Sequence, residues 1–149
     1  MRDLTELKGR FPGVEAEQGR DIPVLKVPAE RLTEVMMYLQ KEYGFNFLAD
    51  LTGVDEPGKE RLVLVYHLMA VPQGEMVRVK VELQRANPCA PSLVGIWPAA
   101  EVQEREAYDL LGITFEGHPD LRRILCPDDF EGHPLRKDFR LTGEEGSAP

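Results

Sequence analysis

Two apolar runs, Arg61–Ala70 and Glu75–Gln84, constrain the fold of this 149-residue chain more than any other feature. They flank a four-residue connection, Val71-Pro-Gln-Gly74, in which the glycine can take the positive φ that a tight turn often needs. In the second run valine and leucine alternate with charged residues, which is typical of a strand that buries one face. The sequence therefore predicts a β-hairpin whose other face meets water or a partner.

Helical and extended patterns surround the hairpin. Apolar residues at helical spacing predict three helices, at about Leu4–Phe11, Pro28–Gly44 and Ala99–Leu111. Short apolar or alternating runs predict three further strands, at about Ile22–Val27, Phe45–Gly53 and Ile113–Phe115. Because proline cannot donate to a sheet ladder, Pro23 suggests that the strand containing it lies at an edge.

Together these elements predict an α+β fold. We expect a two-layer sandwich over residues 1–115, made of one mixed or antiparallel sheet of about four strands with helices on one face. Beyond it the periodicity ends, and proline, glycine and charged residues dominate. This composition predicts an extended docking arm over residues 116–140 and a disordered tail over residues 141–149.

The overall charge limits the classes of partner. The chain carries 18 basic and 26 acidic residues, for a formal charge of −8. Such a balance repels phosphate backbones, so nucleic acid is not an expected partner. The longest strongly apolar stretch, Arg61–Ala70, is far shorter than the roughly 20 residues that span a bilayer, so no direct membrane insertion is expected. Two cysteines alone do not suggest a disulfide scaffold.

The predicted third helix carries the densest candidate chemistry. Four carboxylates share it: Glu101, Glu104, Glu106 and Asp109. Arg105 stands four residues from the first and four from the last, so a charged helix surface with ion pairs is the favoured interpretation. The alternative is a stand-alone acid–base or metal-dependent enzyme that uses four side chains, Glu104, Glu106, His118 and His133. The histidine and cysteine spacings match no compact zinc pattern.

The arm contains an internal echo. Glu116-Gly-His-Pro119 recurs as Glu131-Gly-His-Pro134, and each copy is followed by a basic pair, Arg122-Arg123 or Arg136-Lys137. His-Pro favours an extended backbone, and guanidinium groups can fork onto carboxylates of another chain. We interpret the echo as a repeated docking element, with a solvated loop and coincidental repetition as the alternative.

The helix and the arm together resemble a known family. The run Glu104-Arg-Glu-Ala-Tyr-Asp109-Leu-Leu-Gly-Ile-Thr-Phe-Glu-Gly-His118-Pro-Asp-Leu-Arg122-Arg-Ile-Leu125 is similar to the signature of the 30 kDa subunit of respiratory complex I. The segment Gly132-His-Pro-Leu-Arg-Lys-Asp-Phe139 continues the resemblance. Upstream, Phe45-Asn-Phe-Leu-Ala-Asp50-Leu-Thr-Gly-Val-Asp55 looks like the family's first domain.

The resemblance implies a cofactor-free, non-catalytic subunit of NADH-quinone oxidoreductase, on the cytoplasmic side of the bacterial cell membrane and peripheral to it. NAD, FMN, iron–sulfur clusters and quinone are then expected in partner subunits. The implied partners are chiefly the large (49 kDa-type) quinone-module subunit and the neighbouring iron–sulfur subunits. The implied interface residues are Glu104, Arg105, Glu106, Tyr108, Asp109, His118, Pro119, Arg122, Arg123, His133, Pro134, Arg136 and Lys137. Related membrane-bound hydrogenase complexes have a similar subunit, which leaves the electron donor open.

Overall fold

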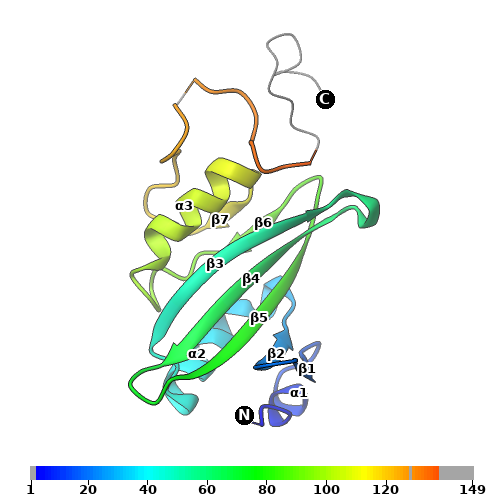
Figure 1. Cartoon of the computed structure of the whole chain (residues 1–149), viewed down its shortest axis with the longest axis vertical. Coiled ribbons are helices and arrows are strands. Elements are labelled where there is room, and N and C mark those ends of the chain that lie inside the picture. The colour runs from blue at the N-terminus through cyan, green and yellow to red at the C-terminus, as the bar shows by residue number, and fades with distance from the viewer. Residues whose placement is uncertain (1–2, 128, 138–149) are drawn as a thin grey trace.

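A computed structural model describes residues 3–127 and 129–137 of the chain and shows a sheet layer against a helix layer (Figure 1). The helices are α1 (Glu6–Arg10), α2 (Leu32–Tyr43) and α3 (Ala100–Leu111), with short 3-10 helices at Ala29–Arg31 and Pro57–Lys59. The strands are β1 (Glu15–Gln18), β2 (Pro23–Lys26), β3 (Phe47–Glu56), β4 (Arg61–Ala70), β5 (Glu75–Gln84), β6 (Cys89–Pro91) and β7 (Thr114–Glu116). The predicted α+β class is confirmed.

The main sheet has five strands in the order β1-β2-β5-β4-β3. It is mixed, because β2 pairs with β5 in parallel while the other pairs are antiparallel. The sequence prediction of about four strands missed β1, and β2 is therefore an inner strand rather than an edge. Pro23 is tolerated because it is the first residue of β2, and the pairing with β5 begins one residue later, at Val24.

The hairpin forms with the predicted bounds. β4 and β5 pair from Arg61 opposite Gln84 to Ala70 opposite Glu75. In the turn Gly74 has a φ of 86° and donates its N–H to the carbonyl oxygen of Ala70 at 2.7 Å. The valines and Leu83 of β5 are buried, whereas its charged side chains lie on the open face of the sheet.

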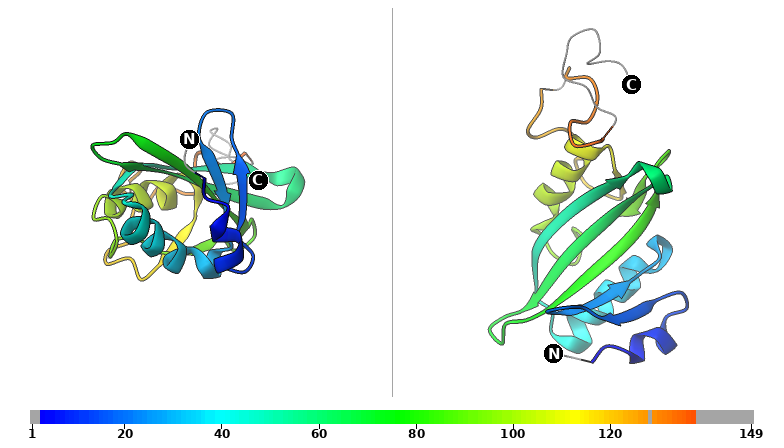
Figure 2. Two further views of the ribbon diagram at one scale, coloured as in Figure 1. Left: turned by 90° about the horizontal axis from the view of Figure 1, so that it is seen from below. Right: turned by 45° about the vertical axis from the view of Figure 1, so that its right-hand side comes forward.

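The helices lie on one face of the sheet, as Figure 2 shows. α2 buries an apolar stripe formed by Leu32, Val35, Met36 and Leu39. α3 approaches β3 so closely that a Cβ on Gly53 would stand 2.4 Å from Cδ1 of Leu111. This contact fixes α3 against the edge strand of the sheet and so positions every polar group that the helix carries.

After β7 the chain continues without helix or strand through the described part of the arm, which lies beside α3 (Figure 1). β6 and β7 form a separate two-stranded parallel sheet. β7 occupies Thr114–Glu116, one residue later than the predicted Ile113–Phe115. The predicted tail over 141–149 lies outside the described residues.

Candidate functional site

The candidate site is built on α3 and on the arm that folds back over it. The helix ends at Gly112, which has a φ of 79° and donates its N–H to the carbonyl oxygen of Tyr108. Glu104 and Asp109 have fully buried side chains. Arg105, Glu106 and Tyr108 are half-buried.

Asp109 is the most highly connected polar side chain of the site. Its Oδ2 atom accepts three consecutive backbone N–H groups, from Ile124 at 3.1 Å, Leu125 at 2.6 Å and Cys126 at 2.9 Å. Its Oδ1 atom accepts Nη1 of Arg123 at 2.7 Å. Burial alone would raise the pKa of Asp109, but the three N–H bonds outweigh it and hold the pKa at about 2. Asp109 is therefore an ionised anchor for the arm.

The paired arginines of the arm are used within the chain. Arg123 also donates Nη2 to the carbonyl oxygen of Gly132 at 2.7 Å, and its side chain is only 11% exposed. We expected a carboxylate of another chain to bind this pair, but for Arg123 the carboxylate is that of Asp109. Arg122 instead has a side chain that is 67% exposed and pairs with Asp120 at 2.9 Å.

Arg105 forms one of its two predicted ion pairs, the one with Glu101. It lies 3.6 Å from Glu101, as the spacing of four residues predicts. It does not pair with Asp109, whose oxygens are occupied by the arm. Its guanidinium turns to the arm and donates to the carbonyl oxygens of Arg122 at 3.2 Å and Arg123 at 3.4 Å.

The two histidines of the echo bind opposite ends of α3. Nε2 of His118 lies 2.9 Å from the carbonyl oxygen of Glu101, and its Nδ1 accepts the N–H of Asp120. Nε2 is therefore the protonated nitrogen that donates to the helix. Nδ1 of His133 lies 2.9 Å from the carbonyl oxygen of Asp109, at the other end of the helix. The repeated motif thus docks onto its own chain.

The prolines that follow the two histidines differ in exposure, since Pro119 is exposed and Pro134 is half-buried. His133 also closes over the end of the helix. Its ring is so near Gly112 that a Cβ there would stand 2.9 Å from Cδ2 of His133. The ring also meets Tyr108 edge-on, with the centroids 6.1 Å apart. The second copy of the echo is therefore the more deeply packed of the two.

A second carboxylate, Asp55 at the end of β3, binds the far end of the arm. It is 3% exposed and accepts Nε of Arg85 at 2.6 Å and Nη2 of Arg85 at 3.1 Å. It also accepts the backbone N–H of Lys137 at 2.7 Å, while Arg136 donates Nη2 to the carbonyl oxygen of Arg85 at 2.7 Å. The hydrogen bond from Arg85 lowers the pKa of Asp55, and the Lys137 N–H adds to this effect.

Sequence reasoning missed Asp55 and Arg85 as members of the site. Asp55 lies 82 positions before Lys137, and Arg85 lies 51 positions before Arg136. The sequence gives only an indirect indication of this role for Asp55, because Asp55 is the last residue of the segment that resembles the family's first domain.

Glu104 binds the loop that precedes α3. Its oxygens accept the Ser92 hydroxyl and the Leu93 N–H, each at 2.7 Å. Burial raises the pKa of Glu104, and these hydrogen bonds oppose the rise only in part. The buried carboxyl thus fixes the loop before α3. Because its side chain is inaccessible, any effect on an interface is indirect.

Cys126 lies next to Asp109, in surroundings that do not activate its thiol. Burial and a hydrogen bond to the Asp109 carboxylate raise the pKa of the Cys126 thiol. A raised pKa keeps the sulfur protonated and poorly nucleophilic. Among residues 3–127 and 129–137, no three histidine, cysteine or acidic side chains come together in a way that could hold a metal ion.

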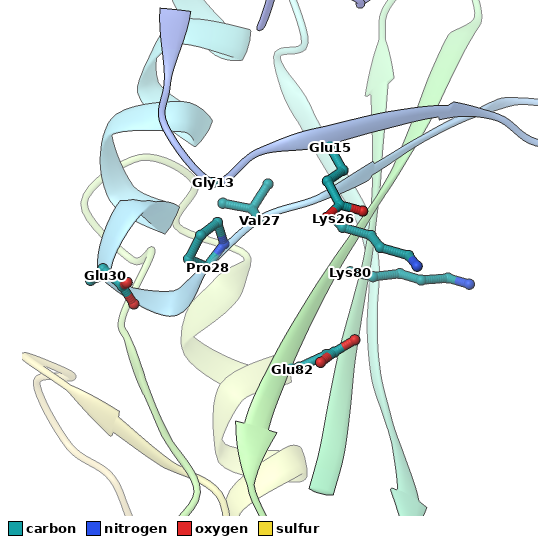
Figure 3. A pocket seen from close by; sticks show the side chains of 8 residues that line it. All are labelled: Gly13, Glu15, Lys26, Val27, Pro28, Glu30, Lys80 and Glu82. Atoms are coloured by element: carbon teal, nitrogen blue, oxygen red, sulfur yellow. The ribbon is translucent and has the colours of Figure 1, made fainter. Parts of the chain in front are cut away.

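The open face of the sheet carries a hollow of about 410 Å³, shown in Figure 3. Its charged lining consists of Glu15, Lys26, Glu30, Lys80 and Glu82. Lys26 already pairs with Glu17 at 3.2 Å, so acidic and basic groups balance each other there. The hollow contains none of the residues predicted for the site.

In the part of the chain that the structure describes, no helix is both long enough and apolar enough to cross a bilayer.

Comparison with known proteins links this geometry to one family. The family model of the respiratory-chain NADH dehydrogenase 30 Kd subunit matches residues 25–145. The C subunit of the NADH-quinone oxidoreductase of Moorella thermoacetica is 59% identical over 143 residues, covering 96% of this chain and 97% of that protein. NADH-quinone oxidoreductase subunit 5 of Thermus thermophilus is 46% identical over 125 residues, and the match covers 77% of this chain and 60% of that protein.

Two solved structures are similar. A trypsin-resistant fragment of Nqo5 has a TM-score of 0.69 and 37% identity, with 79% of this chain and 96% of the fragment covered. A chain of the membrane-bound sulfane sulfur reductase, an archaeal respiratory membrane complex, has a TM-score of 0.80 and 29% identity. That match covers 93% of this chain and 84% of the other.

Proposed function

Since this chain belongs to the family of the 30 kDa subunit of respiratory-chain NADH dehydrogenase, we propose that it is an accessory subunit of the hydrophilic arm of an NADH-quinone oxidoreductase. In this role it performs no redox step. It supports assembly of the quinone module, where electrons from NADH reach quinone and drive ion translocation. NAD, FMN, iron–sulfur clusters and quinone belong to its partner subunits.

One observation supports a structural rather than a catalytic role most directly. Asp109 accepts four hydrogen bonds from the arm of its own chain, so its charge is fully engaged in holding that arm. Asp55 and Glu104 are likewise bonded inside the chain. Side chains that serve acid–base catalysis must reach a substrate, whereas these three carboxylates are buried.

The proposed partners are the large (49 kDa-type) quinone-module subunit first, and then the neighbouring iron–sulfur subunits. Through them the chain would sit peripherally on the cytoplasmic side of the bacterial cell membrane. The arm is the proposed contact region, because it combines exposed apolar and charged side chains on a backbone that is held in place.

Co-expression of the tagged full chain with the large quinone-module subunit of the same organism tests the proposal. We expect the two proteins to co-purify as a stoichiometric complex. A subunit of the NADH-oxidising module, co-expressed in the same way, serves as the control and should not be retained. Retention of neither subunit, with the chain folded by circular dichroism, would contradict the proposal.

A second candidate concerns the electron donor. The archaeal sulfane sulfur reductase contains a chain that matches 93% of this one with a TM-score of 0.80, so the same fold occurs in a respiratory membrane complex with another name. This favours, as the alternative, the equivalent subunit of a related membrane-bound complex such as a hydrogenase. The complex isolated through a tag on this chain distinguishes them: NADH-dependent quinone reduction supports the first candidate, and hydrogen-dependent electron transfer supports the second.

A further inference from the structure

Three titratable or charged side chains form a row across the open face of the sheet: Asp50 on β3, His67 on β4 and Arg78 on β5. In the strand register His67 lies opposite Asp50 on one side and opposite Arg78 on the other. Along β4 its neighbours on the same face are Val65 and Met69, which do not titrate. The charged groups around His67 therefore come from the adjacent strands.

A β-bulge in β3 brings Asp50 into this row. The register with β4 shifts between Leu48 and Asp50, so Ala49 is the extra residue. Leu48 and Leu51 are both buried, although residues three positions apart in a regular strand point to opposite faces. Without the bulge, Ala49 would lie opposite His67. The irregularity thus places a carboxylate next to the imidazole, as bulges do when they redirect a side chain.

The hydrogen bond between Arg78 and His67 fixes the position of the imidazole proton. Nε of Arg78 donates to Nε2 of His67 at 2.9 Å. Because a guanidinium has no acceptor, Nε2 must provide the lone pair. His67 is therefore neutral, with its proton on Nδ1, which lies 3.6 Å from Oδ2 of Asp50. The side chains of His67 and Arg78 are 21% and 29% exposed, so protons from the solvent can reach them.

A second proton on His67 would reverse these interactions. Nε2 could then no longer accept a hydrogen bond, and two positively charged groups would meet at hydrogen-bond distance. The imidazolium would be attracted to Asp50. Arg78 would be attracted to Asp21, in the connection between β1 and β2, whose Oδ1 is already 4.0 Å from its Nη1. Lys80, the next residue of β5 on this face, adds positive charge on the side of Arg78.

We propose that His67 is a pH-sensitive switch that selects the partner of Arg78. The neutral imidazole holds Arg78 against β4, and the imidazolium releases it to Asp21. The change takes place where histidines titrate, between about pH 5 and 8. It moves a positive charge toward the connection between β1 and β2 and pairs Asp50 with His67. This inference goes beyond the proposed function and does not depend on it.

The position of the proton is tested by nitrogen-15 NMR of the imidazoles in the full chain at about pH 8. His67→Gln assigns the resonances of His67. We expect the proton on Nδ1 of His67 and on Nε2 of His118, whose Nδ1 accepts the N–H of Asp120. The two histidines should thus show opposite tautomers in one spectrum. A proton on Nε2 of His67 would overturn the proposal.

The switch is tested by following the Nε resonance of Arg78 as the pH falls from about 8 to about 5. It should shift with the same midpoint as the imidazole of His67, and it should stay constant in His67→Gln. Arg61 is the matched control, because its side chain is also 29% exposed and its Nε donates to Glu56 at 2.5 Å. Its resonance should not move.

Two results of this titration would overturn the switch. One is an Arg78 resonance that stays constant while His67 titrates in the wild-type chain. The other is an Arg78 resonance that still shifts in His67→Gln, since another group would then control the arginine.

Discussion

The backbone N–H of Lys137 donates a 2.7 Å hydrogen bond to Oδ2 of Asp55, which joins the end of the described arm to a strand 82 positions earlier in the chain. Arg85 donates to both oxygens of the same carboxylate. The described arm is therefore attached to the folded domain through two buried carboxylates, Asp109 and Asp55. Replacing either carboxylate should weaken the attachment of the arm.

We expect Asp109→Asn to destabilise the folded chain by about 3 kcal/mol, because it leaves the Arg123 guanidinium, whose side chain is only 11% exposed, without its counter-ion. Asp120→Asn is the matched control, since Asp120 forms a surface pair with Arg122 and should contribute within about 0.5 kcal/mol. Urea unfolding at pH 7 measures both. Equal stabilities for the two variants would contradict the assignment of Asp109 as the anchor.

Acid should remove the contribution of Asp109. Its pKa is about 2 in the folded chain against an ordinary value of 3.8, so the group stabilises the fold above pH 3.8 and loses that effect as the pH falls through about 2. The shift corresponds to about 2 kcal/mol. The difference in unfolding free energy between wild type and Asp109→Asn should therefore narrow by this amount as the pH falls from 5 through about 2. If this difference in unfolding free energy did not change with pH, the ionised Asp109 carboxylate would not be the source of the stabilisation.

Glu104 should have the opposite pH dependence. Its pKa is raised by burial above the ordinary value of 4.5, so the folded chain keeps a proton that the unfolded chain releases. Stability is therefore lost as the pH rises from 4.5 through the raised pKa. Glu104→Gln cannot ionise, and its stability relative to wild type should increase over this range. Urea unfolding at several pH values measures the unfolding free energies of the two proteins. The same pH dependence for both would contradict the prediction.

The contact between Gly112 and His133 can be separated from backbone strain. Gly44 ends α2 with a φ of 76°, and Gly112 ends α3 with a φ of 79°, but open space surrounds Gly44 whereas a Cβ on Gly112 meets His133. We expect Gly44→Ala to cost about 1 kcal/mol and Gly112→Ala at least about 2 kcal/mol. Thermal unfolding measures both.

The excess cost of Gly112→Ala should disappear in a His133→Ala background, because the ring that the new Cβ meets is then absent. An excess that persists in the double variant would assign the cost to the backbone rather than to the contact.

Local patterns explain which elements could be predicted. The hairpin and α3 are predicted well because alternation and helical spacing repeat within each segment. β1, with the sequence Glu-Ala-Glu-Gln, has no apolar alternation because it is mostly exposed. It forms through its pairing with β2, which local periodicity does not report.

The candidate site is predictable only in part: the sequence missed Asp55 and Arg85, and it did not give the hydrogen bonds. The sequence singles out Asp109, Arg123 and His133, and the structure brings them together. The spacing of four residues favours a pair between Arg105 and Asp109, yet that rule describes exposed helix surfaces. Here the arm covers the helix, and three backbone N–H groups with Arg123 surround Asp109 instead. Whether the site residues contact other subunits stays a prediction.

The two attachment points of the arm, at Asp109 and at Asp55, also make each other easier to form. Before the Asp109 contact exists, the whole stretch from the end of β7 to Lys137 must close a loop onto Asp55. Once Cys126 is held, the free length is roughly halved, which lowers the entropic cost of closure by about 0.6 kcal/mol. By thermodynamic reciprocity the Asp55 contact favours the Asp109 contact equally. Breaking either contact should therefore make the opening of the other about threefold more frequent.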